Sequence, residues 1–208
     1  MPELWAVLKV LCLMCIPYAL WLLTWAITQK VYESGAAGSM LIFTVIVMFG
    51  QILGAAIAGY LIRSRGSARW VAMLGILLMT PYLFIFWRAD IFNANAAVAA
   101  ARALDYYWLL TIFGMLAYMG QGIAFVAQLA YLAKFYRLSN NHHCGIIVGY
   151  TSLMIPIANL FMALMGWAIM SNSIWMLIFA VLVVIVGCVW GSLDAAAAPE
   201  EFMAETGV

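Results

Sequence analysis

The chain has 208 residues, of which 68% are hydrophobic and only 8% are charged, and its mean hydropathy is +1.08. A soluble domain carries roughly a quarter of its residues as charged side chains, so this composition excludes a soluble globular protein and indicates an integral membrane protein. The formal net charge of +1 gives no reason to expect a nucleic-acid partner. Because the backbone inside a bilayer must satisfy its own hydrogen bonds, we expect an all-α fold.

Apolar runs long enough to cross a bilayer, which takes about 20 residues in a helix, occur at six places. In chain order they are 5–28, 40–62, 70–87, 107–133, 145–170 and 175–193. These runs predict six transmembrane helices in one domain, residues 1–193. Pro81 lies inside the third run and should kink that helix without ending it. The acidic residues 194–208 are expected to form a disordered tail.

The longest loop runs from Arg88 to Tyr106. Its centre, 96–101, is rich in Ala, the residue with the highest helix propensity. We therefore predict a short helix in this loop, lying on the membrane surface.

Positively charged residues are unevenly distributed among the loops. The loops after the second and fourth runs contain Arg63, Arg65, Arg69, Lys134 and Arg137, whereas the other three loops contain Lys30, Arg88 and Arg102. Loops that carry an excess of Lys and Arg stay in the cytoplasm. This distribution predicts a multi-pass protein of the bacterial inner membrane with both termini, and the acidic tail, in the cytoplasm.

Small residues recur at four-residue spacing along several runs. Gly50, Gly54 and Ala58 share one face of the second run, with Ala55 and Gly59 beside them, and the pairs Gly145/Gly149 and Gly187/Gly191 have the same spacing. Such ridges let helix backbones approach closely in a membrane. Two interpretations stay open, packing within the chain and an interface with another subunit.

Polar side chains in the middle of the runs are all uncharged. Tyr118, Gln121, Phe125 and Gln128 follow each other at spacings of three, four and three, which places them on one face of a helix. Gln51, Asn159 and Thr24 of other runs are candidates to meet them. These groups either form hydrogen bonds between helices or line a cavity for a polar solute. The absence of mid-run Asp and Glu argues against proton-coupled transport by this chain alone.

No catalytic or cofactor-binding constellation is recognisable in the sequence. His142, His143 and Cys144 form the only cluster of metal-type ligands, but neighbouring ligands alone do not close a tetrahedral site, and we interpret them as a polar loop. Cys12 and Cys15 lie inside an apolar run and behave there as small hydrophobic residues. We therefore expect neither an enzyme nor a bound metal or cofactor.

Residues 59–70 read Gly-Tyr-Leu-Ile-Arg-Ser-Arg-Gly-Ser-Ala-Arg-Trp. This segment resembles the loop 2–3 signature of major facilitator superfamily transporters, with Gly59, Leu61, Gly66 and Arg69 on matching positions. The small residues of 50–59, the segment 118–122 and the glycine- and proline-bearing run from Gly145 through Pro156 to Gly166 are similar to the family's second, fourth and fifth helices. The resemblance covers nearly the whole chain and implies the six-helix N-terminal half of such a transporter.

Three positions depart from the family pattern, and one of them is Ser64, which stands where the loop signature has a basic residue. Arg63 stands where the loop signature has an Asp that stabilises one conformation, and Tyr118 stands where the fourth helix has an Arg associated with proton coupling or substrate charge. The family also forms its cavity between two six-helix halves, so this chain should pair with a copy of itself or with a second membrane protein.

The resemblance implies a transporter of a small polar or amphipathic solute, with the first, second, fourth and fifth helices facing the cavity. The expected substrate-binding residues are Gln51, Tyr118, Gln121, Gln128 and Asn159. A different hypothesis is a subunit or assembly factor that transports nothing and packs against a larger membrane complex. A third is an inactive remnant of a longer transporter.

Overall fold

The computed structural model describes residues 37–65, 68–91, 93, 95–138, 152, 156–157, 159–160, 163–164 and 174–193. Within these residues it contains α2 (Ala37–Arg65), α3 (Ala68–Ala89), α4 (Ala96–Asp105), α5 (Tyr107–Leu138) and α8 (Ile174–Leu193). The predicted all-α class is confirmed, and helices cover the ranges 40–62, 70–87, 107–133 and 175–193. The range 5–28, most of 145–170 and the tail 194–208 lie outside the described residues.

Three of these helices are long and apolar enough to cross a membrane, over Met40–Arg63, Trp70–Ala89 and Tyr107–Ala127. Their outward surfaces are apolar as well, since Leu41 is 68% exposed and Ile52 is 67% exposed on α2. A water-soluble protein rarely exposes an apolar surface of this extent. Length and surface character together support a membrane protein.

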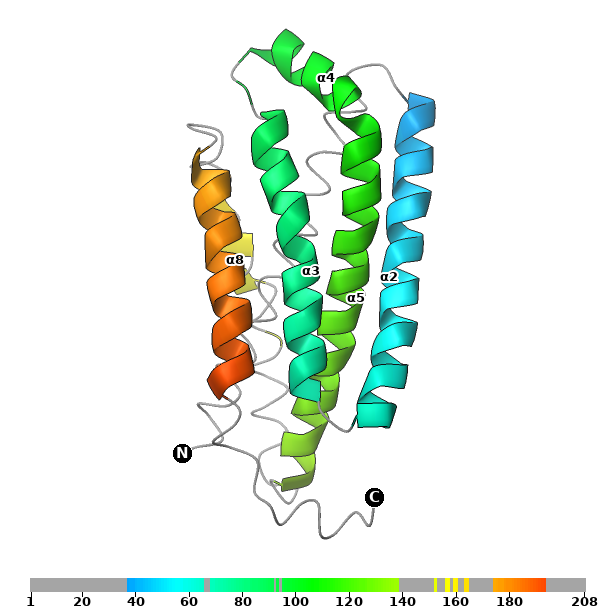
Figure 1. The fold of residues 1–208 in the computed structure, drawn as a ribbon, viewed down its shortest axis with the longest axis vertical. Helices are drawn as coiled ribbons and strands as arrows, with labels where there is room; N and C mark the ends of the chain where they lie inside the picture. The colour runs from blue at the N-terminus through cyan, green and yellow to red at the C-terminus, as the bar shows by residue number, and fades with distance from the viewer. Residues whose placement is uncertain are drawn as a thin grey trace.

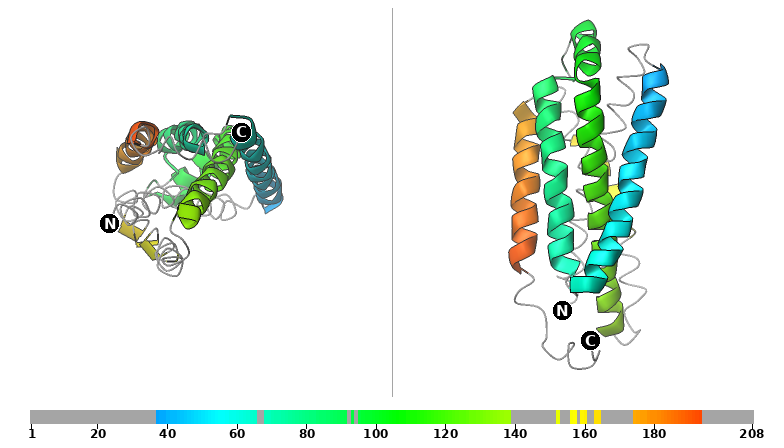
Figure 2. Two further views of the ribbon diagram at one scale, coloured as in Figure 1. Left: turned by 90° about the horizontal axis from the view of Figure 1, so that it is seen from below. Right: turned by 45° about the vertical axis from the view of Figure 1, so that its right-hand side comes forward.

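The long helices stand side by side, and α5 lies between α2 and α3 (Figure 1). Helix α8 packs on α3 at the other edge, and two further views show the same order of α8, α3, α5 and α2 (Figure 2). The colour gradient shows that α2, α5 and α8 run in one direction and α3 in the other. Helix α5 therefore contacts one parallel and one antiparallel neighbour.

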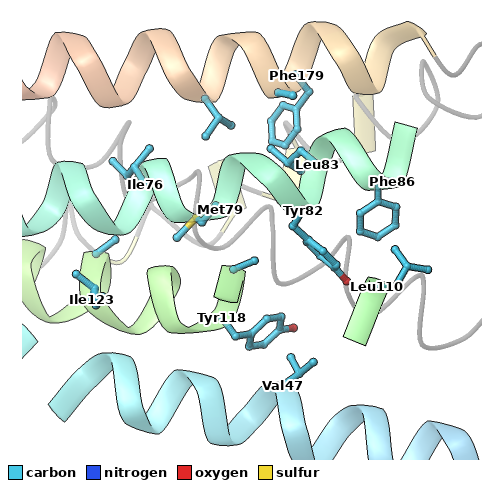
Figure 3. Close-up of a cluster of buried hydrophobic side chains, with 14 of the residues drawn as sticks. Val47, Ile76, Met79, Tyr82, Leu83, Phe86, Leu110, Tyr118, Ile123 and Phe179 are labelled. Carbon is cyan, nitrogen blue, oxygen red and sulfur yellow. The ribbon is translucent and has the colours of Figure 1, made fainter. Parts of the chain in front are cut away.

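The core lies on both sides of α3 (Figure 3). Its largest buried side chains on α3 are Ile76, Met79, Tyr82, Leu83 and Phe86. Phe179 of α8 lies over Leu83 on one side, and Tyr82 extends toward α5 on the other. Tyr82 and Phe86 also form an edge-to-face pair with ring centroids 4.7 Å apart, a favoured aromatic geometry. The core thus joins α8 to α5 through α3.

Helix α3 continues through Pro81 to Ala89, as expected of a proline inside a membrane helix. It ends at Asp90, which takes a left-handed φ of +49° and donates its backbone N–H to the Phe86 carbonyl oxygen at 3.2 Å. This arrangement is a common helix end, although Gly is the usual residue. The Asp90 carboxylate accepts a hydrogen bond from the Asn93 side chain at 2.8 Å, which holds the turn.

The predicted helix in the longest loop is present as α4. Asn95 caps its N-terminus, because its side-chain oxygen accepts a hydrogen bond from the Ala97 backbone N–H at 3.1 Å. One face of α4 is buried through Ala99 and Ala103. Only Tyr106 separates α4 from α5, so α4 lies at the end of the bundle where α3 ends and α5 begins (Figure 1).

Candidate polar site on helix α5

Gly50 and Gly54 of α2 pack directly against the backbone of α5. A Cβ atom added to Gly54 would lie 2.8 Å from the Cα of Met119 on α5, and one added to Gly50 would overlap the Met115 carbonyl oxygen. No side chain larger than hydrogen fits at either position without moving the backbone of α5. At these two glycines the predicted small-residue face of α2 therefore packs within the chain, and it does not form an interface with another subunit there.

Glycines also bring α5 close to both of its neighbours around residue 121. A Cβ atom added to Gly120 would lie 2.9 Å from the Leu78 Cβ of α3. One added to Gly122 would lie 3.0 Å from the Ala55 backbone nitrogen of α2. Gln121 therefore stands between two backbone contacts that face different helices, and these contacts fix the position of its Cα.

Gln121 is the central polar residue of this region. Its side chain is only 7% exposed, and its Oε1 atom accepts no hydrogen bond from the described residues. Burial of an amide oxygen without a donor costs about 1–3 kcal/mol, and buried polar groups in native proteins are almost always satisfied. A buried acceptor without a donor among the described residues is available to bind a donor from another molecule.

Two further predicted residues lie near Gln121. The backbone of Gln51 on α2 faces Gly122, because a Cβ added to that glycine would overlap the Gln51 carbonyl oxygen. The Gln51 side chain is half-buried. Tyr118 is 2% exposed and lies one helical turn before Gln121, close to Val47 of α2 (Figure 3). The structure thus brings Gln51, Tyr118 and Gln121 to neighbouring levels of the α2–α5 pair.

The remaining residues of the predicted polar face, and Asn159 of another run, are placed differently. Phe125 is 44% exposed, so the face emerges from the bundle one turn after Gln121. Asn159 is an exposed helical residue. Gln128 belongs to α5, but its side chain lies outside the described part of the chain.

Of the residues compared with the loop 2–3 signature, Gly59, Leu61 and Arg63 lie near the end of α2 and Arg69 near the start of α3. Gly59 is exposed, and a Cβ atom added to it would meet nothing within 4 Å. Leu61 is half-buried against the core and Arg63 is exposed. Gly66 and the side chain of Arg69 fall outside the described residues.

Sequence reasoning missed the buried hydroxyl groups of two threonines. Thr111 on α5 is 1% exposed and donates a hydrogen bond from Oγ1 to the Tyr107 carbonyl oxygen at 2.7 Å. Thr80 on α3 is 8% exposed, and its Oγ1 makes no hydrogen bond. Both are polar residues inside apolar runs, and that signal could have identified them in the sequence.

The chemistry available around Gln121 is hydrogen bonding by neutral groups. The ranges 40–62, 70–87 and 107–133 contain no Asp, Glu, Lys or Arg. Among the described residues no group of three or more His, Cys, Asp or Glu could hold a metal ion. The cluster of His142, His143 and Cys144 lies outside them.

The fold and this site define an all-α protein with three helices able to cross a membrane and a buried amide where α2, α3 and α5 approach each other. Comparisons with known protein families, curated proteins and solved structures found no match for this chain.

Proposed function

We propose that the protein is a six-helix half-transporter of the major facilitator type. It moves a small polar or amphipathic solute across the bacterial inner membrane, paired with a second copy or with a related half. Transport proceeds by rocking of the two halves about a site near the middle of the membrane. The spans 5–28 and 145–170 complete the six helices, and both termini lie in the cytoplasm.

The observation that carries this proposal is the buried amide of Gln121, next in the chain to the glycine that packs on the Gln51 backbone. Structural glutamines in membrane helices form hydrogen bonds to neighbouring helices, whereas the Oε1 atom of Gln121 accepts none from the part of the chain that the structure describes. Substrate sites place a few polar groups in a largely apolar wall to orient a ligand. Gln51, Tyr118 and Gln121 on α2 and α5 match that description, and Gln128 and Asn159 extend the proposed site.

The first test is the oligomeric state, measured by native mass spectrometry on protein extracted with its lipid. A homodimer provides the twelve helices that the proposed mechanism needs. A monomer, or a complex with unlike chains only, contradicts transport by a homodimer.

The second test is uptake by proteoliposomes of a panel of labelled sugars, polyols and amides. Gln121→Leu and Gln128→Leu should abolish uptake of the transported solute while expression stays at the wild-type level. Thr111→Val is the matched control, since it alters another buried polar residue of α5 whose hydroxyl is bonded within the helix. Unchanged uptake in Gln121→Leu removes this residue from the site.

The second candidate function is a subunit or assembly factor without transport activity. It is favoured by the exposed apolar side chains of α2, among them Ile52 and Tyr60, which is 72% exposed. Gly50 and Gly54 are not available to such a partner, because they already face α5. Co-purification of unlike membrane proteins in constant ratio, together with no uptake of any panel solute, supports this function over transport.

A further inference from the structure

The Oε1 atom of Gln121 is an acceptor in a defined position. Gly120 and Gly122 hold its backbone against α3 and α2, and the side chain is more than nine-tenths buried. The amide is therefore largely removed from the outer surface of the bundle. A solute that donates a hydrogen bond to Oε1 recovers the free energy that the unsatisfied acceptor costs.

Charge restricts the solute further. Within α2, α3 and α5, the ranges 40–62, 70–87 and 107–127 contain no charged side chain that could neutralise an ionic solute at the level of Gln121. Moving an unpaired ion out of water into an apolar interior costs far more than one hydrogen bond returns. An uncharged solute with hydroxyl or amide groups avoids that cost and still supplies a donor.

We propose that Gln121 selects uncharged solutes that carry a hydroxyl or amide donor and discriminates against ions of the same size. This inference rests on the proposed transport function. According to this proposal, Gln121 is the residue that determines specificity. The protein recognises its solute by hydrogen bonding rather than by ion pairing.

The test is equilibrium binding to the full-length protein in detergent, measured by the shift of its thermal unfolding with solute concentration. The probes are pairs of similar size that differ in charge, namely glucose with gluconate, glucose with glucosamine, and acetamide with acetate. A neutral member should stabilise the protein in a saturable way, and its charged partner should not. Gln121→Leu should weaken that binding roughly tenfold, as expected for loss of one well-placed hydrogen bond.

Thr111→Val is again the control, and its binding should match the wild type. Saturable stabilisation by gluconate, glucosamine or acetate overturns the inference, as does the absence of any response to glucose and acetamide. Equal binding by the wild type and Gln121→Leu also overturns it. If a neutral probe binds but is not taken up into liposomes, the inference stands and the transport function is contradicted. If charged solutes are taken up and Gln121→Leu does not change that uptake, the transport function stands and the inference is overturned.

Discussion

Gly54 of α2 lies directly against the backbone of Met119 on α5, so closely that a Cβ atom on the glycine would overlap the Met119 carbonyl oxygen. In a membrane, helices associate through such close packing, because lipid is as apolar as the protein interior. This contact and the equivalent one between Gly50 and Met115 fix the α2–α5 pair that carries Gln51 and Gln121.

Gly54→Ala should lower the free energy of unfolding by about 1–3 kcal/mol, since an added methyl group forces α2 and α5 apart. Gly59→Ala is the matched control on the same helix. Gly59 is exposed with nothing near its Cα, so the change should be neutral or stabilising by up to about 1 kcal/mol through helix propensity. Titration with a denaturing detergent, followed by circular dichroism, measures both. Equal effects of the two substitutions contradict the close contact.

Gln121→Leu should raise the free energy of unfolding by about 1 kcal/mol, because it replaces an unsatisfied buried amide with an apolar side chain of similar size. The same detergent titration measures this change. Gained stability together with lost solute binding identifies a functional residue. If the variant is less stable than the wild type, Gln121 serves in hydrogen bonding between helices instead.

Two buried threonines should respond differently to removal of the hydroxyl group. Thr111→Val loses the hydrogen bond to Tyr107 and should lower the free energy of unfolding by about 0.6 kcal/mol, the average for such bonds in membrane helices. Thr80→Val removes a hydroxyl that makes no hydrogen bond and should be neutral or stabilising. Titration of both variants with the denaturing detergent measures the two changes in the free energy of unfolding. A larger loss of stability in Thr80→Val than in Thr111→Val contradicts the prediction.

Asn95→Ala should loosen the first turn of α4, because the Ala97 backbone N–H loses its acceptor. An N-cap contributes about 1 kcal/mol, so hydrogen exchange of the amides in the first turn should accelerate roughly fivefold. Mass spectrometry of exchanged peptides measures the rate. Asn95→Asp keeps an acceptor oxygen and should exchange like the wild type. Exchange that is unchanged in Asn95→Ala means that contacts other than the cap hold α4.

The helices were predictable because hydropathy is a local property of the chain. The predicted range 70–87 lies inside α3, and the start predicted at residue 107 coincides with the start of α5. The short helix in the longest loop was also predictable, because its alanines favour helix in any surroundings. In addition, the sequence identified Gln121 and Tyr118 as polar residues on one helix face.

The buried side of each helix could not be predicted from the sequence. A helix in water shows its buried face through the alternation of apolar and polar residues. On α2 and α5 the lipid-facing side and the packed side are both mostly apolar, because lipid and core both select apolar side chains. The four-residue spacing places Gly54 on the small-residue face of α2 and Gly59 beside it, but it does not show that Gly54 contacts α5 while Gly59 is exposed. For the same reason Phe125, expected beside Gln121, is half exposed while Gln121 is buried.

The sequence by itself determined that this is an all-α protein with membrane-spanning helices and a neutral polar face on α5. Only the tertiary structure decided that α5 lies between α2 and α3, that glycines hold it there, and that Gln121 ends up buried with its acceptor unsatisfied. The physical reason is that spanning a bilayer depends on composition, whereas burial inside a bundle depends on which backbones can approach each other.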